Sequence, residues 1–255
     1  MTSPRSILDY QQDCFHDYSR SVGLPRSYTY PDGNPIRPLP PYHVATRGLM
    51  IVGAYPSARF EYRPTYQNEE PRRLVPVADN LHPFADEHYF DGVRPRHLES
   101  SQGLSKYFLD PLGVPPHKTW ITDLVKVFLY KPDHVASCGA AHPRFRAHEL
   151  RSQFLPLGIK SLTWLNREVA LCKPRLIVTL GLEVAQVVSS ELRARADDLL
   201  GRPLSHPDSL GGYPVLYLPH PDACRRWHKW RRNMARRRRI VANTLHWALQ
   251  SPSTA

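Results

Sequence analysis

Three short segments of the chain combine flexible backbone with side chains that can exchange hydrogen bonds or protons with a ligand. They read GAYPS at residues 53–57, ITDLVK at 121–126 and HPD at 220–222. Glycine and proline in the first segment predict a sharp turn whose backbone can approach a ligand closely. Asp123 and His220 supply ionisable groups to the other two segments, and such groups serve hydrogen-bonding and proton-transfer chemistry. An ordinary strand-to-loop turn is the alternative interpretation of GAYPS.

Apolar runs that predict buried strands place these three segments at strand ends. We expect strands within residues 48–57, 119–129, 174–181 and 213–223, and helices within 5–20, 104–113, 152–172 and 182–192. Strands alternating with helices predict an α/β protein, a three-layer α/β/α sandwich with a central, mostly parallel four-stranded sheet. Ligands bind beyond the carboxyl ends of such strands, where the three segments would meet. The polar, proline-rich residues 58–98 are expected to cross that edge as a long excursion.

Positive charge is concentrated in one stretch. The formal net charge is +11, and residues 225–239 carry nine Lys or Arg and no acidic residue, so the rest of the chain is nearly balanced. We expect a basic amphipathic helix there that contacts phosphates. A solvated helix face, or a nonspecific contact with RNA or a membrane, would also explain the charge.

Length and cysteine usage indicate one intracellular domain. The 255 residues fit a single α/β domain, which we place at 48–250, with an N-terminal extension at 1–47 packing on it and a tail at 251–255. The four cysteines are far apart and form no C-x-x-C pair, which is typical of reduced thiols in the cytosol. No apolar signal core or membrane-length apolar run is present. We therefore expect a cytoplasmic monomer with no membrane partner and no metal.

The order of these segments, together with Pro83-Phe84 and the strand at 175–181, resembles the uracil-DNA glycosylase superfamily over roughly residues 48–250. The resemblance is to the branch without an iron–sulfur cluster, because the chain lacks the cysteine pair and has Val127 after Lys126. The resemblance implies that the protein needs no cofactor. It also implies that the partner is DNA containing a damaged or deaminated base, and that the protein acts on this DNA at the nucleoid. A base inside a duplex is unreachable, so base flipping is implied.

The resemblance assigns the GAYPS loop to the base pocket and to the attacking water. Many relatives have an acid or an asparagine at the inner positions, which are Ala54 and Tyr55 in this chain. Backbone around these two residues would then hold the water, with Glu61 and Asp79 as candidates to orient it. Further implied contacts are those of the base with Gly53 and Phe84 and of DNA with Ser57.

Phe84 would stack on the flipped base, an interaction of about 1–3 kcal/mol. The alternatives are that Phe84 fills the core beneath a long loop, or that Tyr89 or Phe90 stacks instead.

Asp123 stands where many relatives carry asparagine, and the difference affects which base is read. Uracil presents an O4 acceptor and an N3–H donor, whereas an ionised carboxylate can only accept. Ionised Asp123 would favour a base with an amino donor, as cytosine has. If burial raised its pKa, protonated Asp123 could serve uracil. A structural alternative is that Asp123 caps the next loop.

His220 is the residue that the resemblance marks most clearly as catalytic. It would donate a hydrogen bond to the base O2 and stabilise negative charge on the leaving base. Residues 222–227 would wedge into the minor groove, although Asp222 replaces a small residue and could instead be an N-cap. The DNA contacts implied after the wedge come from Arg225, Arg226, Lys229, Arg231 and Arg232, and they would make binding salt-dependent.

Two functions remain open at the level of sequence. The first is a monofunctional DNA glycosylase, a hydrolase that cleaves the N-glycosidic bond of a flipped-out uracil or other deaminated or altered base in base-excision repair. The second is a catalytically inactive or degenerate member that still binds DNA, favoured by the missing acid in GAYPS and opposed by His220. An RNA-binding protein would explain the basic stretch but not the motifs at the strand ends.

Overall fold

A parallel sheet of four strands forms the centre of the computed structural model, which describes residues 6–66, 72–110, 113–200, 202, 204–226, 239 and 243. The strands pair in the order β6-β1-β7-β8 and every pairing is parallel. Their bounds are Leu49–Gly53 for β1, Thr119–Asp123 for β6, Leu176–Leu180 for β7 and Val215–Leu218 for β8. Each strand is buried along its whole length. The predicted buried strands and the predicted α/β/α sandwich are therefore confirmed.

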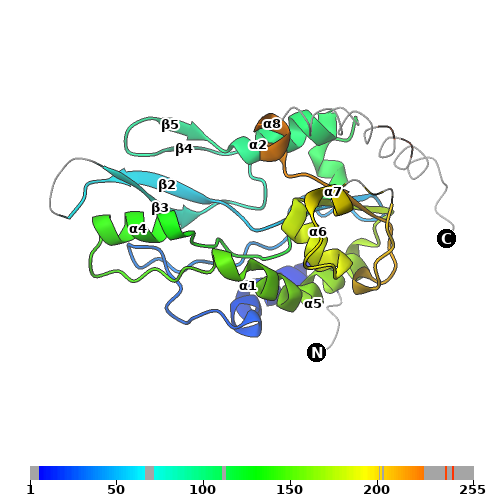
Figure 1. Cartoon of the computed structure of the whole chain (residues 1–255), viewed down its shortest axis with the longest axis horizontal. Helices are drawn as coiled ribbons and strands as arrows, with labels where there is room; N and C mark the ends of the chain where they lie inside the picture. The colour runs from blue at the N-terminus through cyan, green and yellow to red at the C-terminus, as the bar shows by residue number, and fades with distance from the viewer. Residues whose placement is uncertain are drawn as a thin grey trace.

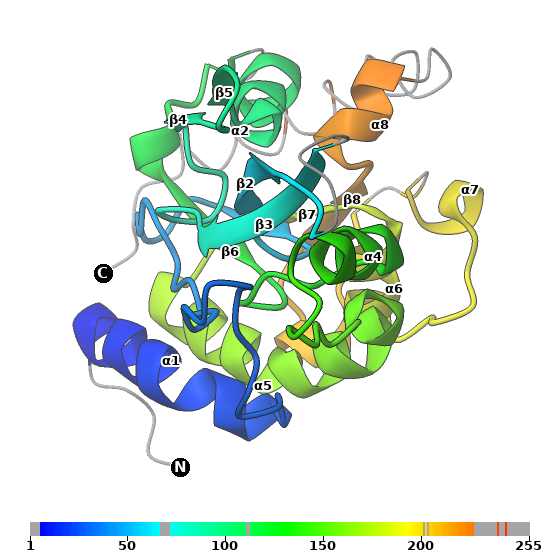
Figure 2. The same ribbon diagram turned by 90° about the vertical axis from the view of Figure 1, so that its left-hand side faces the viewer.

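Helices cover both faces of the sheet (Figure 1, Figure 2). Met50 and Val52 of β1 point into a core formed with α1 (Ile7–Val22), α5 (Phe154–Cys172) and α6 (Leu182–Ser189). The alternate residues Leu49 and Ile51 pack on the other face, where the covering elements are α2 (Glu99–Leu104), the π-helical turn η1 (Ser105–Leu109) and α8 (Pro221–Arg226). The alternation along β1 is what an internal strand with helices on both sides requires.

The prediction of a long irregular excursion over residues 58–98 was wrong. Two antiparallel hairpins form there, β2 (Ala58–Arg63) with β3 (Arg73–Asp79) and β4 (His88–Phe90) with β5 (Pro95–His97). Figure 1 shows both hairpins extending from the same side of the molecule. Their prolines sit at Pro76, where the register shifts nearby, and at Pro95, which begins a strand; edge and terminal positions tolerate the missing N–H of proline.

Short helices complete the described chain. The helix α4 (Pro132–Ala141), which the sequence did not predict, packs against β3. The remaining elements are η2 (Pro116–Lys118), η3 (Arg151–Gln153), α7 (Ala196–Leu199) and η4 (Asp208–Leu210). Among the described residues, no helix has the length and apolar character needed to cross a membrane.

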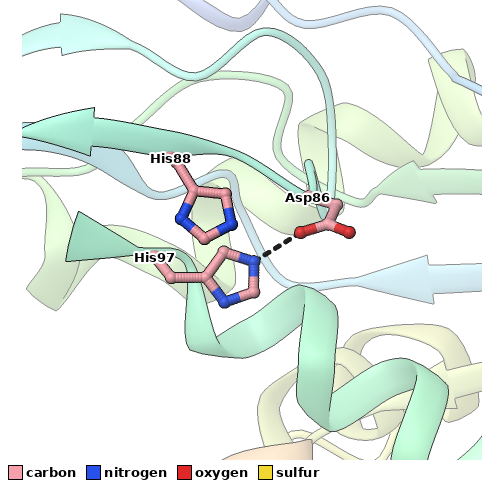
Figure 3. Close-up of side chains that lie close together, drawn as sticks. All are labelled: Asp86, His88 and His97. Atoms are coloured by element: carbon pink, nitrogen blue, oxygen red, sulfur yellow. Dashed lines mark hydrogen bonds and ion pairs between the residues drawn. The ribbon is translucent and has the colours of Figure 1, made fainter. Parts of the chain in front are cut away.

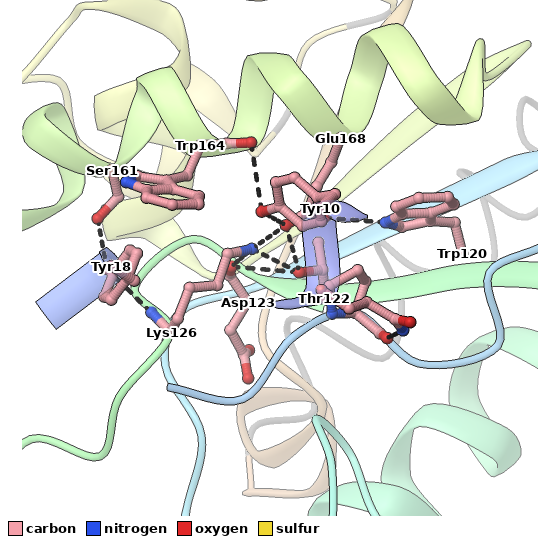
Figure 4. A network of polar contacts seen from close by, with 11 residues as sticks. Tyr10, Tyr18, Trp120, Thr122, Asp123, Lys126, Ser161, Trp164 and Glu168 are labelled. Carbon is pink, nitrogen blue, oxygen red and sulfur yellow. Dashed lines mark hydrogen bonds and ion pairs between the residues drawn. The ribbon is translucent and has the colours of Figure 1, made fainter. Parts of the chain in front are cut away.

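A buried ion pair joins the sheet to its helices beneath the carboxyl end of β6 (Figure 4). The side chains of Lys126 and Glu168 are both completely buried and form a salt bridge. Lys126 Nζ also donates to Thr122 Oγ1 and to the carbonyl oxygen of Asp123, each at 2.6 Å. Trp120 Nε1 donates to the other Glu168 oxygen at 2.9 Å, so the pair is satisfied from the strand as well as from α5.

The N-terminal helix α1 closes this network from outside. Tyr10 donates its hydroxyl to Glu168 at 2.6 Å. Tyr18 accepts the backbone N–H of Lys126 at 3.0 Å and shares a hydrogen bond of 2.6 Å with Ser161. Burial raises the pKa of Tyr18 far above its usual value, so the hydroxyl stays neutral. Helix α1 is therefore part of the core that supports β6.

Lys126→Met should destabilise the protein by about 3–5 kcal/mol, because it leaves the Glu168 carboxylate buried without its cation. The measurement is urea unfolding at pH 7. The double variant Lys126→Met/Glu168→Gln should recover part of the loss, and the exposed Lys118→Met should change stability by less than about 0.5 kcal/mol. A loss below 1 kcal/mol for Lys126→Met would contradict the role assigned to the pair.

Candidate active site

A cleft of about 750 Å³ opens at the carboxyl ends of the four central strands. Seven of the residues that the sequence singled out line it together, namely Ala54, Tyr55, Ser57, Phe84, Asp123, His220 and Asp222. They come from the loops after β1 and β3, from the last residue of β6, and from the segment after β8 that leads into α8. The convergence expected from parallel-sheet topology is thus present in the structure.

Gly53 shapes the floor of the cleft without lining it. A Cβ atom on Gly53 would lie 2.6 Å from Cε2 of Phe84 and would also collide with Oδ1 of Asp123. Only glycine leaves room for the Phe84 ring and the Asp123 carboxyl group, because both occupy the space where a Cβ of residue 53 would stand. Gly53 therefore acts through Phe84 and Asp123.

Phe84 is held in a backbone conformation that aromatic residues rarely adopt. Its φ is 51°, in the left-handed region. The loop is anchored by the buried carboxylate of Glu87, which is paired with Arg59 and accepts the N–H of Leu81 at 3.0 Å. Strained residues persist where surrounding contacts over-determine them, frequently at binding sites.

The alternative aromatic residues for stacking, Tyr89 and Phe90, lie on β4 and do not line the cleft. Phe90 is 61% exposed, and the Tyr89 hydroxyl accepts the N–H of Phe60 at 3.4 Å. Phe84 is therefore the ring of the three that faces the cleft.

Asp123 presents a buried carboxyl group that accepts no hydrogen bond from any described residue. Its carbonyl oxygen is held by Lys126, whereas Figure 4 shows its carboxyl group pointing away from that network. Burial raises the pKa of Asp123 to about 7, with Lys126 opposing the shift and Glu168 adding to it. The alternative that Asp123 caps a loop is wrong for the described chain. At neutral pH the group is divided between acid and carboxylate.

His220 is oriented by the first turn of α8. The N–H of Asp222 donates to His220 Nδ1 at 3.3 Å, so the ring hydrogen is placed on Nε2. The His220 carbonyl accepts the N–H of Ala223 at 2.9 Å, which puts His220 at the N-cap and Pro221 at the first helical position that proline favours. Asp222 is therefore inside the helix, and the expectation that it is the N-cap was wrong. An acid in the first turn suits the helix dipole.

Five polar side chains that the sequence did not single out also line the cleft: Asn80, Lys131, His134, Arg151 and Glu183. Arg151 donates from Nε to the Tyr55 hydroxyl at 3.1 Å and forms a two-pronged ion pair with Glu183. Because Arg151 lies at the start of η3 and Glu183 at the start of α6, no motif or spacing in the sequence connects them. The Tyr55 side chain is thereby fixed against the wall, and the Glu183 charge is balanced.

Another missed residue is Asn80, which lines the same cleft. It is 6% exposed, and its Oδ1 has no hydrogen-bond partner among the described residues. A buried amide oxygen without a partner is unfavourable, and a ligand or water in the cleft would satisfy it. Its place one residue after β3 is the only sequence signal that could have found it.

Glu61 and Asp79, the candidates to orient water, do not line the cleft. Glu61 is paired with Arg63 at 2.7 Å, and Asp79 accepts hydrogen bonds from the Tyr30 hydroxyl at 2.7 Å and from the N–H of Arg37. The β2–β3 hairpin carries both away from the strand ends, so this expectation was wrong.

The predicted DNA-binding helix over 225–239 falls almost entirely outside the described residues, and so do Lys229, Arg231 and Arg232. Arg225 and Arg226 end α8, the helix that follows His220. The four cysteines are buried and none is in a disulfide.

Comparison with protein families assigns the chain to a superfamily. The family model described as "Uracil DNA glycosylase superfamily" matches residues 40–243, most of the chain. No curated protein sequence gave a match. The chain belongs to the uracil DNA glycosylase superfamily, as the resemblance predicted, and this membership supports a glycosylase-type hydrolase acting on DNA.

Asp123→Asn should stabilise the protein increasingly as pH rises. The folded-state pKa of about 7 lies above the value near 3.9 of an unfolded chain. The folded state alone retains the proton between these values, so stability falls as pH rises through this window. We expect the Tm advantage of the variant to widen by several degrees from pH 4.5 to pH 8, at about 2–4 °C per kcal/mol. Thermal melts would measure it, with Asp110→Asn as the exposed control. An advantage independent of pH would count against burial of an acid at this site.

Proposed function

We propose that this protein is a monofunctional DNA glycosylase that hydrolyses the N-glycosidic bond of a flipped-out deaminated base, with uracil as the first substrate to test. The observation that carries the proposal is the buried carboxyl group of Asp123, which lines the cleft, accepts no hydrogen bond from any described residue and has a pKa of about 7. Such a group reads a base edge differently in its two protonation states.

Protonated Asp123 has one donor and one acceptor, which match the O4 and N3–H of uracil. Hypoxanthine presents the same pair of groups, a carbonyl oxygen beside a ring N–H. The carboxylate can only accept, and it would face the lone pairs of O4. Uracil release therefore depends on the acid form, and Phe84, held beside Asp123 over Gly53, offers the stacking surface.

Negative charge develops on the base as it departs, and His220 is placed to stabilise it. His220 carries its hydrogen on Nε2 because Nδ1 accepts a backbone N–H. That hydrogen can be donated to the base O2 as the glycosidic bond lengthens. The imidazole needs no proton transfer for this role, since the hydrogen bond alone stabilises the anion.

The attacking water lacks the acid that many relatives place in the first loop. Besides the Asp123 carboxyl group, Asn80 Oδ1 is a buried acceptor in the cleft that has no partner among the described residues. We assign the water to this oxygen and to the backbone around Ala54 and Tyr55. Glycosidic bond cleavage with an oxocarbenium-like transition state develops positive charge on the sugar, so an oriented water suffices as the nucleophile.

Base release from oligonucleotides tests the activity. Single- and double-stranded substrates carrying uracil, hypoxanthine, xanthine or cytosine should show release of at least one deaminated base. His220→Ala should lower the rate by about 10²–10³-fold, the usual effect of removing one such donor. His117→Ala, an exposed histidine before β6, should leave it unchanged. Salt-sensitive DNA binding with no release from any substrate would instead identify a degenerate, non-catalytic member.

The pH profile of uracil release tests how Asp123 reads the base. Wild-type activity should fall about tenfold per unit above pH 7, as the acid form is lost. Asp123→Asn supplies a donor and an acceptor at every pH, so its activity should persist at pH 8–9 and its profile should lose this limb. Identical profiles for the two proteins would refute the proposed reading of the base edge.

A further inference from the structure

A second cluster of ligating side chains lies outside the cleft, on the β4–β5 hairpin (Figure 3). It consists of Asp86, His88 and His97, each of which offers a ligand atom within 4.8 Å of the other two. His88 and His97 face each other across the hairpin as a direct cross-strand pair. Their rings stack with centroids 4.2 Å apart and planes 11° apart, and Asp86 is hydrogen-bonded to His97 Nε2.

We propose that Asp86, His88 and His97 bind a divalent transition-metal ion, with zinc as the best match. Two imidazole nitrogens and one carboxylate oxygen are ligands that Zn²⁺ accepts, at about 2.0–2.2 Å. Tetrahedral coordination at that length places ligand atoms about 3.3 Å apart. The cluster must contract, and the stacked imidazole rings must turn so that both nitrogen lone pairs meet at one point. The exposure of Asp86 and His88 leaves space for this movement. The fourth position would be held by water.

The surroundings of His97 support coordination through Nε2. The side-chain amide of Gln102 on α2 is hydrogen-bonded to the other ring nitrogen, Nδ1. Turning this amide by 180° presents Oε1 to an N–H on Nδ1, which leaves the Nε2 lone pair available for a metal. Ligating histidines usually have such a partner on the second nitrogen, because it fixes the tautomer and the orientation of the ring.

The position of the cluster indicates what the metal would do. The hairpin has only three paired positions, and isolated hairpins of this size are marginally stable. Asp86 lies two residues after Phe84, and His97 directly precedes Leu98, which also lines the cleft. A metal would therefore join both strands of the hairpin to the loop that carries Phe84. Binding of the metal does not depend on the glycosylase activity. Any functional consequence of holding the Phe84 loop in place rests on the proposed function.

Metal titration of the full-length protein tests the site. After treatment with EDTA and removal of the chelator, isothermal titration with Zn²⁺ should show one site that His88→Ala and His97→Ala each weaken at least tenfold. His117→Ala, outside the cluster, should bind as the wild type does. Co²⁺ should give visible absorption bands of a low-symmetry, four-coordinate ion in the wild type only. Zn²⁺ should raise the Tm of the wild type and not of the two variants.

Asp86→Asn covers the case in which a histidine variant fails to fold, because it keeps the size of the side chain while removing the charge of a ligand. It should also weaken Zn²⁺ binding. The proposal is overturned if no Zn²⁺ binds at micromolar concentrations, or if folded variants bind it as tightly as the wild type, which would leave Asp86 and His97 as a plain hydrogen-bonded pair. Base release measured on the same metal-free protein reports on the glycosylase proposal separately.

Discussion

The end of β6 that lines the cleft is held in place by a lysine, Lys126, whose side chain is completely buried. An unpaired buried ammonium group is prohibitively costly, so Lys126 must be met by Glu168, by Thr122 and by the carbonyl of Asp123 simultaneously. These partners belong to β6 and α5, and Tyr10 adds α1 through its hydroxyl. Satisfying one charge thus fixes the end of β6 relative to two helices. Asp123 is held in place as well, because its carbonyl oxygen accepts a hydrogen bond from Lys126.

The same pair sets the electrostatics of the site from beneath. Burial is the largest cause of the raised pKa of Asp123, while Lys126 lowers this pKa and Glu168 raises it further. Because the two charges of the pair act on Asp123 in opposite directions, burial remains the dominant cause of the shift. The protein therefore tolerates, at a cost in stability, a buried carboxyl group that has no hydrogen-bond partner in the described part of the chain, and it tolerates Phe84 in the left-handed region of backbone space at the same place. Such costs concentrated in one cleft are characteristic of binding sites.

The sheet and the meeting of three motifs could be predicted from sequence because both follow from local patterns. Buried parallel strands read as continuous apolar runs, and topology then brings their carboxyl ends together. The hairpins at 58–97 could not, since prolines and charges obscure short strands that are exposed on one side. Burial of Lys126 was also hidden, because lysine is ordinarily a surface residue and its partner Glu168 lies 42 positions away. The prediction that Glu61 or Asp79 orients the water was wrong, because residues close to a motif in sequence need not lie close to it in space.

Two departures from the family pattern, at residues 54–55 and at Asp123, are physically linked. A carboxylate in the first loop, added to a buried Asp123, would put two unpaired acids in one cleft, where they could not both ionise at ordinary pH. With Ala54 and Tyr55 in the loop, that competition is absent. Glu183 does not restore it, because its charge is matched by Arg151, which the Tyr55 hydroxyl helps to hold. The proton on Asp123 is then controlled by burial and by the Lys126–Glu168 pair. Under the proposed reading of the base edge, aspartate can replace asparagine at the end of β6 only when the first loop gives up its acid, so the two substitutions would amount to one change in the chemistry of the site.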